Sequence, residues 1–481
     1  MNTLIHTDVA IIGAGSAGLY ALREVRRAGR DFLLIDRGPL GTTCARVGCM
    51  PSKLALHAGG EWTLRKTLPT IGVDGIDGLT IDLKTTWTQL RAQRDFFANS
   101  GASKARAAAG DKLIEGSARF LEPTLLEVSS ANGTQRIRAR AVVIATGSRP
   151  VVPGWLEDLR DRTVTTDELF ELESLPSSIG ILGLGAIGLE MGLALSRLGV
   201  RVVAVDLAHN VAGIVDPVIG EQAHHRFSKE MTLWLGTQAQ VLRAETGVIL
   251  RTEHHETEVE RVLAALGRRP NIDGLNLASA GFPLNERGLP IFSQLTMQIG
   301  DLPVYIAGDA NADAPLMHEA ADEGAIAGYN AAREAPTAFW RKVSLAIAFS
   351  NPDVVTVGTR FDALPKEGVI IGKASGDKNG RARILGATDS VLRIYADATD
   401  GRLLGAAMIA HGGEHLAHLL AWAIQRGETA HALLEMPFYH PVIEEMLQTA
   451  LQDLVTQLTP TNDYPLGLVP TSTQLSLKPT K

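Results

Sequence analysis

Two copies of one glycine-rich pattern, 170 residues apart, constrain the fold of this chain more than any other feature. The first copy runs from an apolar stretch into Gly13-Ala-Gly15-Ser-Ala-Gly18, then through a helical stretch and a second apolar stretch that ends at Asp36. The second copy repeats this order from Gly183-Leu-Gly185-Ala-Ile-Gly188 to Asp206, and the first glycine precedes the acid by 23 residues in both. Each copy predicts a strand–turn–helix–strand unit of a parallel α/β sheet.

This pattern is typical of dinucleotide binding. The first glycine allows a tight turn, the second lets a pyrophosphate approach the backbone, and the third lets the helix pack on the strand. The phosphates then lie at the helix N-terminus, and the acid hydrogen-bonds an adenosine ribose. One copy is a weak indication because glycine-rich turns are common. Two copies with matching strand, helix and acid indicate two dinucleotide sites.

The only two cysteines of the chain, Cys44 and Cys49, follow the first copy closely. A structural disulfide across so short a loop would constrain the unfolded chain only slightly. On a helix these positions would lie roughly 140° apart, so bridging them needs a distortion that Gly48 helps to allow. Two unconnected core cysteines are the alternative. We interpret the pair as a redox couple.

Composition excludes several classes of protein. With 481 residues, 45% of them hydrophobic, we expect three or four domains with sizeable cores. A net charge of −7 disfavours nucleic acid and anionic membranes as partners. No apolar run approaches the roughly 18 residues of a membrane helix, and the N-terminal stretch has no signal-peptide pattern. We therefore expect a cytoplasmic protein, whose thiols would cycle.

The rest of the chain alternates between strand and helix signals. Buried strands end at Thr146-Gly147 and at Gly308-Asp309, and a helical pattern covers about 315–332. Beyond about residue 345 strands and hairpins dominate, and Asp400-Gly401 predicts a type I′ turn between two strands. Amphipathic helices are predicted around 413–426 and 442–458.

With these features in order, the chain resembles the class I pyridine nucleotide–disulfide oxidoreductases over about residues 5–460, and within them most resembles dihydrolipoamide dehydrogenase. Its segment GTTCARVGCMPSK, residues 41–53, stands against the family signature GGTCxNxGCxPSK. Further matches are ATG at 145–147, GLGAIGLE at 183–190, GRRPN at 267–271, GD at 308–309, and HPVIEE at 440–445 against HPTxxE.

The resemblance implies an α/β fold with two Rossmann-like dinucleotide-binding domains and a C-terminal α+β dimerisation domain. We expect an FAD-binding domain over 1–150, an NAD-binding domain over 151–272, and a second, central part of the FAD-binding domain over 273–345. The dimerisation domain would cover 346–465, and a mobile tail 466–481.

The resemblance also implies the cofactors and the residues that hold them. For FAD these are Gly13, Gly15, Gly18, Asp36, Thr43, Lys53, Thr146, Gly147 and Asp309. For NAD they are Gly183, Gly185, Gly188, Asp206 and Gly267. Asp206 independently favours NAD over NADP, because it suits a free 2′-hydroxyl and no arginine follows it in residues 207–210.

Catalytic roles are implied in the same way. Cys49 would lie next to the flavin, and Cys44 would be the thiol that meets substrate. Lys53 would lie by the flavin and pair with Glu190. His440, oriented by Glu445, would reach Cys44 of the partner subunit, which makes the active protein a homodimer with a shared site.

Elementary chemistry supports a base at this position, because thiol–disulfide exchange runs through a thiolate and histidine titrates near neutrality. Taken alone, His440 would be an interface histidine, and Lys53 and Glu190 would be surface charges. A metal site at Glu414, His415 and His418 lacks a further ligand motif, so we expect no metal.

The expected reaction is oxidation of dihydrolipoamide by NAD⁺ through the Cys44–Cys49 pair and FAD. The mercuric branch of the family is disfavoured because no cysteine follows residue 49. The alternatives are an NAD(P)H-dependent reductase of another disulfide, or a flavoprotein oxidase or transhydrogenase that does not use the thiols. The chain could also dock into a 2-oxo acid dehydrogenase complex.

Four positions depart from the family pattern. Thr42 replaces a glycine and Arg46 an asparagine in the redox segment, Ala186 replaces a bulkier residue, and Val442 opens the variable part of HPTxxE. Arg46 is either a solvated helix residue or a cation that stabilises the thiolate or attracts an acidic disulfide.

Overall fold

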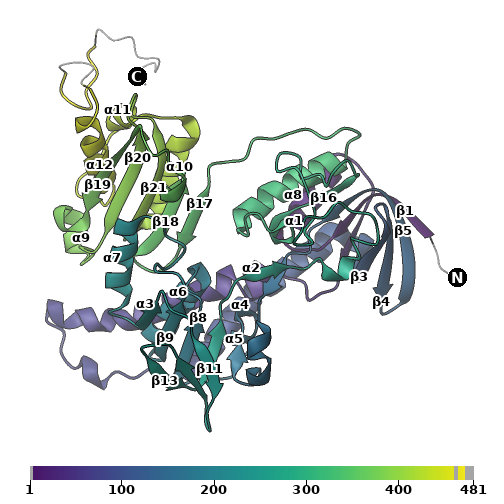
Figure 1. Ribbon diagram of the computed structural model, residues 1–481, viewed down its shortest axis with the longest axis horizontal. Helices are drawn as coiled ribbons and strands as arrows, with labels where there is room; N and C mark the ends of the chain where they lie inside the picture. Colours follow the sequence, from purple (N-terminus) through teal and green to yellow (C-terminus); the bar gives the residue numbers. More distant parts are fainter. Residues whose placement is uncertain (1–3, 460–463, 472–481) are drawn as a thin grey trace. The chain divides into compact units, whose positions relative to one another are not determined.

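The computed structural model describes residues 4–459 and 464–471, and the chain divides into two compact units (Figure 1). The first unit contains the described residues up to 58, then 64–176 and 260–341. The second contains 59–63, 177–259 and the described residues from 342 onwards. Of the predicted tail, 472–481 lie outside the described residues. None of the described helices is both long and apolar enough to span a membrane.

The first unit is built on a parallel sheet. Its strands are β1 (Leu4–Ile12), β2 (Phe32–Asp36), β3 (Leu113–Glu122), β4 (Leu125–Ser130), β5 (Gly133–Ile144) and β16 (Val304–Ile306). Strands β16, β5, β1, β2 and β3 pair in parallel in that order, and β4 joins β3 to β5 as an antiparallel meander. Ile12 pairs with both Ile35 and Ile144, and Ile144 with Ile306. The residues that follow these strands therefore meet at one edge.

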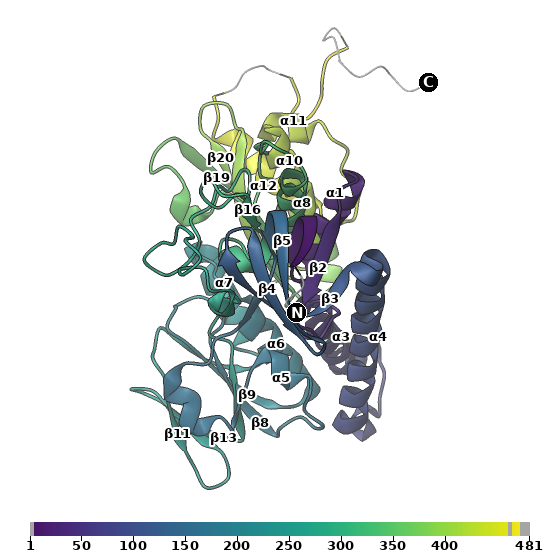
Figure 2. The ribbon, with the colours of Figure 1, turned by 90° about the vertical axis from the view of Figure 1, so that its right-hand side faces the viewer.

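Both faces of this sheet are buried, as continuous apolar strands predict. Helices α1 (Ser16–Arg27) and α8 (Met317–Ala331) lie side by side on one face in both views (Figures 1 and 2). Their backbones approach so closely that a Cβ on Gly324 would collide with the carbonyl of Ala17, and one on Gly328 with that of Ala21. The other face packs on the meander and on residues 272–299.

The other regular elements of the first unit are α2 (Thr43–Arg46), the start of α3 (Cys49–Leu64), α4 (Leu83–Ala109), β6 (Ser148–Pro150), β7 (Thr163–Val164), α5 (Thr166–Leu169), β14 (Arg261–Ala264) and β15 (Arg268–Pro270). Strand β15 pairs with β6, and β14 with β7.

The second unit begins with the second glycine-rich copy. Its elements are β8 (Ser178–Leu182), α6 (Ala186–Leu198), β9 (Arg201–Asp206), α7 (Pro217–Phe227), β10 (Thr232–Leu235), β11 (Gln240–Arg243), β12 (Val248–Arg251) and β13 (Glu256–Val259). Strands β8, β9 and β10 are parallel, and β11–β13 form an antiparallel ribbon.

The C-terminal part of this unit is an antiparallel sheet in the order β17-β18-β21-β20-β19. The strands are β17 (Leu345–Ala348), β18 (Asp353–Gly358), β19 (Val369–Ser375), β20 (Val391–Asp397) and β21 (Leu403–Ala410). Helices α9 (Gly380–Ile384), α10 (Gly413–Arg426), α11 (Ala430–Leu434) and α12 (Glu445–Thr456) accompany it, and α10–α12 share its core. The observed architecture confirms the predicted fold class.

The hairpin predicted at Asp400-Gly401 is present, but its turn is not type I′. That type needs positive φ at both central residues, and only Gly401 has it, at 72°. The loop is longer, because Asp397 and Arg402 close it by a backbone hydrogen bond of 2.9 Å.

Candidate active site

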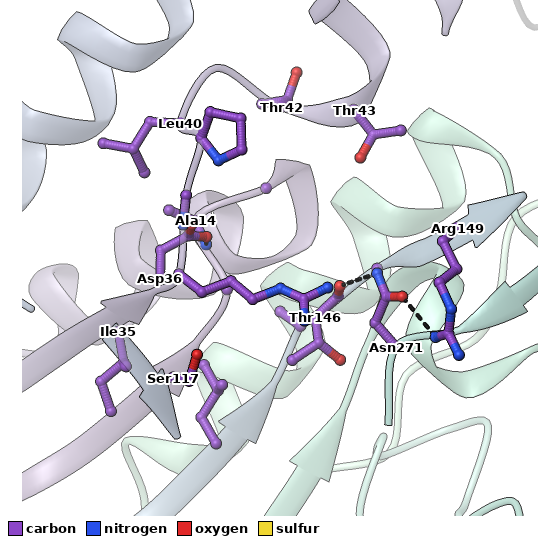
Figure 3. Close-up of a pocket in the computed structure, with 18 of the residues that line it drawn as sticks. Ala14, Ile35, Asp36, Leu40, Thr42, Thr43, Ser117, Thr146, Arg149 and Asn271 are labelled. Atoms are coloured by element: carbon purple, nitrogen blue, oxygen red, sulfur yellow. Dashed lines mark hydrogen bonds between the residues drawn. The ribbon is translucent and has the colours of Figure 1, made fainter. Parts of the chain in front are cut away.

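A cavity of about 670 Å³ opens at the carboxyl edge of the first sheet (Figure 3). Its wall comes from the ends of β1, β2 and β5, from the redox segment, and from residues 116–118 and 271–275. Of the residues predicted to bind FAD, the wall includes Gly13, Gly15, Asp36, Thr43, Thr146 and Gly147. The wall formed by the described residues does not include Gly18, Lys53 or Asp309.

The three positions of the first copy carry glycine for different physical reasons. Gly13 has φ of 111°, and a Cβ there would collide with the carbonyl of Ala145. A Cβ on Gly18 would collide with the carbonyl of Gly13. At Gly15 a Cβ would meet no protein atom within 4 Å, so the protein itself does not require glycine there. The open space suits a phosphate against the backbone, which fits the diphosphate of FAD.

Asp36 is held firmly at the cavity edge. One carboxylate oxygen accepts a hydrogen bond of 2.6 Å from the backbone N–H of Ala14, and the other accepts one of 2.6 Å from Gly38. Helix α1 has neither a side-chain cap nor an acid in its first turn, so no side chain occupies its N-terminal donors. These donors can therefore serve an anion.

The far wall is a hydrogen-bond network that joins two predicted residues, Thr146 and Asp309, to side chains that sequence reasoning did not assign. Figure 3 shows Asn271 donating to the carbonyl of Thr146, at 3.1 Å, and accepting from Arg149, at 3.0 Å. Ser148 donates to a carboxylate oxygen of Asp309 at 2.6 Å, and the guanidinium of Arg268 donates to the Ser148 hydroxyl at 2.8 Å. Asp309 is thus linked to the cavity wall through Ser148.

Glu323 is a second residue that sequence reasoning missed. Its side chain is fully buried, and one oxygen accepts from the backbone N–H of Gly308 at 2.7 Å and from Asn311 at 2.8 Å. Arg341 donates to the other oxygen at 2.9 Å. Burial raises the pKa of Glu323. The signal in the sequence was an acid four residues after Glu319 in an alanine- and glycine-rich helix.

The redox segment breaks into two helices between its cysteines. Cys44 lies in α2 and Cys49 begins α3, and both are half-buried thiols. Gly48 has ordinary φ; its role is close approach, since a Cβ would lie 3.2 Å from the carbonyl of Thr43. A hydrogen bond with Cys49 and burial raise the pKa of the Cys44 thiol, and the charge of Lys53 opposes them.

Thr42 has an unusual backbone just before this pair. Its φ of 60° and ψ of 145° belong to a region that is essentially restricted to glycine. Its hydroxyl accepts from the backbone N–H of Ala45 at 3.1 Å and caps α2. The segment thus combines backbone strain with a local hydrogen bond that offsets it in part.

His440 and Glu445 form a dyad in the second unit. The Nδ1 of His440 lies 2.9 Å from one carboxylate oxygen, and the N–H of Val442 donates to the other at 3.1 Å. The hydrogen bond to His440, followed by that from Val442, lowers the pKa of Glu445. The imidazole is 77% exposed. Asn379 donates to the carbonyl of Val442 at 3.1 Å and anchors this loop.

The second glycine-rich copy repeats the geometry of the first. Gly183 has φ of 91°, a Cβ on Gly188 would collide with the carbonyl of Gly183, and one on Gly185 would meet no protein atom within 4 Å. Asp206 accepts from the backbone N–H of Leu184 and, at 2.7 Å, from that of Ala208. The turn therefore also suits a dinucleotide phosphate.

Glu190, on α6, is 4% exposed and accepts from the backbone N–H of Phe349 at 3.0 Å. Lys53 belongs to the first unit, where its Nζ lies 3.4 Å from the Ser52 hydroxyl, so its pairing with Glu190 stays a prediction. Gly267 also belongs to the first unit, with φ of 95°.

Comparison with known proteins identifies the family of the chain. The pyridine nucleotide-disulphide oxidoreductase model matches residues 7–324, and the dimerisation-domain model of the same name matches 345–451. A dihydrolipoyl dehydrogenase of Bacillus subtilis is 26% identical over 461 residues, covering 93% of this chain and 96% of that protein. One from Halobacterium salinarum is 29% identical over 470 residues, with coverages of 93% and 96%.

Solved structures share the fold. LpdA from Mycobacterium tuberculosis superposes with a TM-score of 0.81 at 23% identity, covering 93% of this chain and 99% of that one. The copper(II) complex of the HOCl-induced flavoprotein disulfide reductase RclA from Escherichia coli gives a TM-score of 0.80 at 23% identity, with coverages of 94% and 99%. The chain belongs to the pyridine nucleotide-disulphide oxidoreductases, an enzyme family that uses FAD and NAD(H).

Proposed function

We propose that this protein oxidises dihydrolipoamide with NAD⁺, through the Cys44–Cys49 pair and FAD. The observation that carries the proposal is the pair itself: two half-buried thiols across a helix break, in the segment whose Thr43 lines the cavity. The dihydrolipoyl dehydrogenases among the relatives support the substrate, and Asp206 supports NAD⁺.

The thiol chemistry balances as two exchanges. A substrate thiolate attacks the sulfur of Cys44 in the oxidised pair, the Cys44–Cys49 bond breaks, and Cys49 leaves as a thiolate. The second substrate thiolate attacks the substrate sulfur now joined to Cys44, which releases Cys44 and the cyclic disulfide. The pair gains the two electrons that the substrate loses. FAD, when bound, supplies the two-electron relay between the pair and NAD⁺.

Each exchange needs a group that accepts a proton, because only the thiolate is a nucleophile. We propose that His440 does this for the site that contains Cys44 of the partner subunit. Its contact with Glu445 turns Nδ1 toward the carboxylate and leaves Nε2 for the proton. This role makes the protein a homodimer whose two sites are shared between subunits. Lys53 and Glu190 would pair beside the flavin, and Gly267 would line the NAD site.

We place the protein in the cytoplasm, where thiol pairs are kept reducible. Docking into a 2-oxo acid dehydrogenase complex is compatible with this activity, and co-purification with a lipoyl-bearing protein tests it.

The test is NAD⁺ reduction by dihydrolipoamide with FAD-loaded protein. We expect kcat/KM above roughly 10⁴ M⁻¹s⁻¹, the low end for enzymes, and loss of this activity in Cys44→Ser. Negligible turnover of dihydrolipoamide, with NADH still reducing the flavin, would indicate that the substrate is another disulfide. Full activity in Cys44→Ser would instead indicate a flavoprotein reaction that does not use the thiols.

A further inference from the structure

Arg46 remains unexplained by the thiol chemistry. Three arginines line the cavity at the carboxyl edge of the first sheet, namely Arg37, Arg46 and Arg149. Arg149 is engaged by Asn271, Asp273 and the carbonyl of Pro270, and Arg37 is exposed. Arg46 is half-buried, yet its guanidinium has no hydrogen bond or ion pair with any described residue. A guanidinium at a cavity wall that has no protein partner is available to bind an anion.

The backbone that carries Arg46 is fixed. Its N–H donates to the carbonyl of Thr42 at 3.1 Å, and its carbonyl accepts from the buried Arg94 at 3.3 Å. Arg94 in turn pairs with Glu171 at 2.8 Å. The Cδ of Arg46 passes over Gly41, 3.3 Å from where a Cβ would stand, and Gly41 lines the same cavity. The side chain therefore leaves a rigid turn along the cavity wall.

The acidic residues of the cavity wall have partners other than the guanidinium of Arg46. Asp36 is satisfied by two backbone N–H groups, Asp273 pairs with Arg149, and Asp167 lies 3.5 Å from Arg268. The anion that the cavity suits is a diphosphate, since the space above Gly15 is open and no side chain caps α1.

One earlier interpretation of Arg46, a cation that stabilises the thiolate, receives less support. Among the main influences on the pKa of Cys44, the cation that lowers it is Lys53 and not Arg46. We propose that Arg46 binds the diphosphate of FAD and supplies a charge that the usual asparagine cannot. This proposal rests on the FAD part of the proposed function and not on its substrate.

Titration of the apoprotein with FAD, followed by flavin fluorescence, tests the proposal. A charged hydrogen bond of typical strength predicts that Arg46→Asn raises the Kd about ten- to a hundredfold, with Arg46→Lys in between. The affinity of the wild type should also fall more steeply with salt than that of Arg46→Asn. ADP, which carries the same diphosphate, should compete less well in the variant by a similar factor. Arg287→Asn, which removes an exposed arginine away from the cavity, is the matched control and should change nothing.

An FAD affinity within twofold of wild type in Arg46→Asn would overturn the proposal, and so would weakened FAD binding with unchanged ADP competition. A raised KM for dihydrolipoamide at saturating FAD, with FAD affinity intact, would also overturn it and assign Arg46 to the substrate. Because binding is measured without dihydrolipoamide, the proposal can fail or hold whatever the physiological disulfide is.

Discussion

The two glycine-rich copies share their local geometry but not their surroundings. In each, the acid accepts from the N–H one residue after the first glycine and from the N–H two residues after itself. In each, the third glycine lies against the carbonyl of the first, and the second faces open space. The pattern therefore encodes the local geometry of the phosphate-binding turn.

The surroundings of the first copy come from distant parts of the chain. Its turn lies against Ala145 at the end of β5, its helix against α8, and its cavity is closed by residues 116–118 and 271–275. In the second copy, helix α6 instead carries the buried Glu190, held by the backbone of Phe349. The motif makes the turn, whereas long-range packing decides which chemistry the turn serves.

The third glycine offers the largest test of this separation. Gly18→Ala forces a carbonyl collision in the first copy, and Gly188→Ala forces the same in the second. We expect each variant to lose several kcal/mol of stability, at the severe end for point mutations, and the first variant also to lose FAD. We expect the second to retain FAD and to lose NADH binding. Flavin content and NADH titration measure both cofactors, and loss of FAD in Gly188→Ala would show that the two sites are not independent.

Buried acids provide the next test. Glu323→Ala removes the acceptor of two buried donors, the N–H of Gly308 and the amide of Asn311, while Glu319 still pairs with Arg341, so the free energy of unfolding should fall by about 2–5 kcal/mol. Glu190→Ala removes the acceptor of the backbone N–H of Phe349, and the loss of that hydrogen bond should cost about 1–3 kcal/mol. Chemical denaturation followed by circular dichroism compares them. Equal losses would mean that the two acids are held in the same way.

Variants at the second glycine of each copy distinguish an effect on cofactor binding from an effect on folding. Gly15→Ala and Gly185→Ala meet no protein atom, so both variants should fold with melting temperatures close to wild type. A methyl group in the phosphate position should weaken FAD binding to the first, and NADH binding to the second, by about tenfold or more. Unchanged affinities would show that the phosphates do not approach these glycines.

Variants at Thr42 test whether the backbone of the redox segment is strained. Thr42→Ala and Thr42→Gly both lose the cap to Ala45, but only glycine relieves the backbone at φ 60°. We therefore expect Thr42→Gly to be the more stable of the two by about 1–3 kcal/mol. Equal denaturation midpoints would show that the backbone of Thr42 is not strained.

A smaller effect concerns Asp353 in the second unit, whose pKa burial raises from 3.8 to about 6. The folded state then binds a proton more tightly than the unfolded state, so the stability that Asp353 contributes is present below about pH 4 and is lost as the pH rises through 6. The melting temperature of wild type relative to Asp353→Asn should fall across this range. A constant difference from pH 4 to pH 7 would contradict the raised pKa.

Much of the fold followed from periodicity and glycine spacing. The helical pattern at 315–332 became α8 at Met317–Ala331, and the amphipathic pattern at 413–426 became α10. The type of turn at Gly401 could not be predicted, because strand pairing sets the loop length. Glu323 and Ser148 were missed because their partners lie 15 and 161 residues away in the chain, at positions that only the fold brings together.

We propose that Cys44 and Cys49 are a redox couple in series with FAD, and anaerobic reductive titration tests this claim. A disulfide and a flavin each take up two electrons, so wild-type protein should consume twice the reductant per subunit that Cys44→Ser consumes. We expect that ratio. We also expect oxidised lipoamide to accept electrons from the reduced wild-type protein but not from reduced Cys44→Ser. Equal consumption by the two proteins would contradict the claim and make the cysteines bystanders to a flavin reaction.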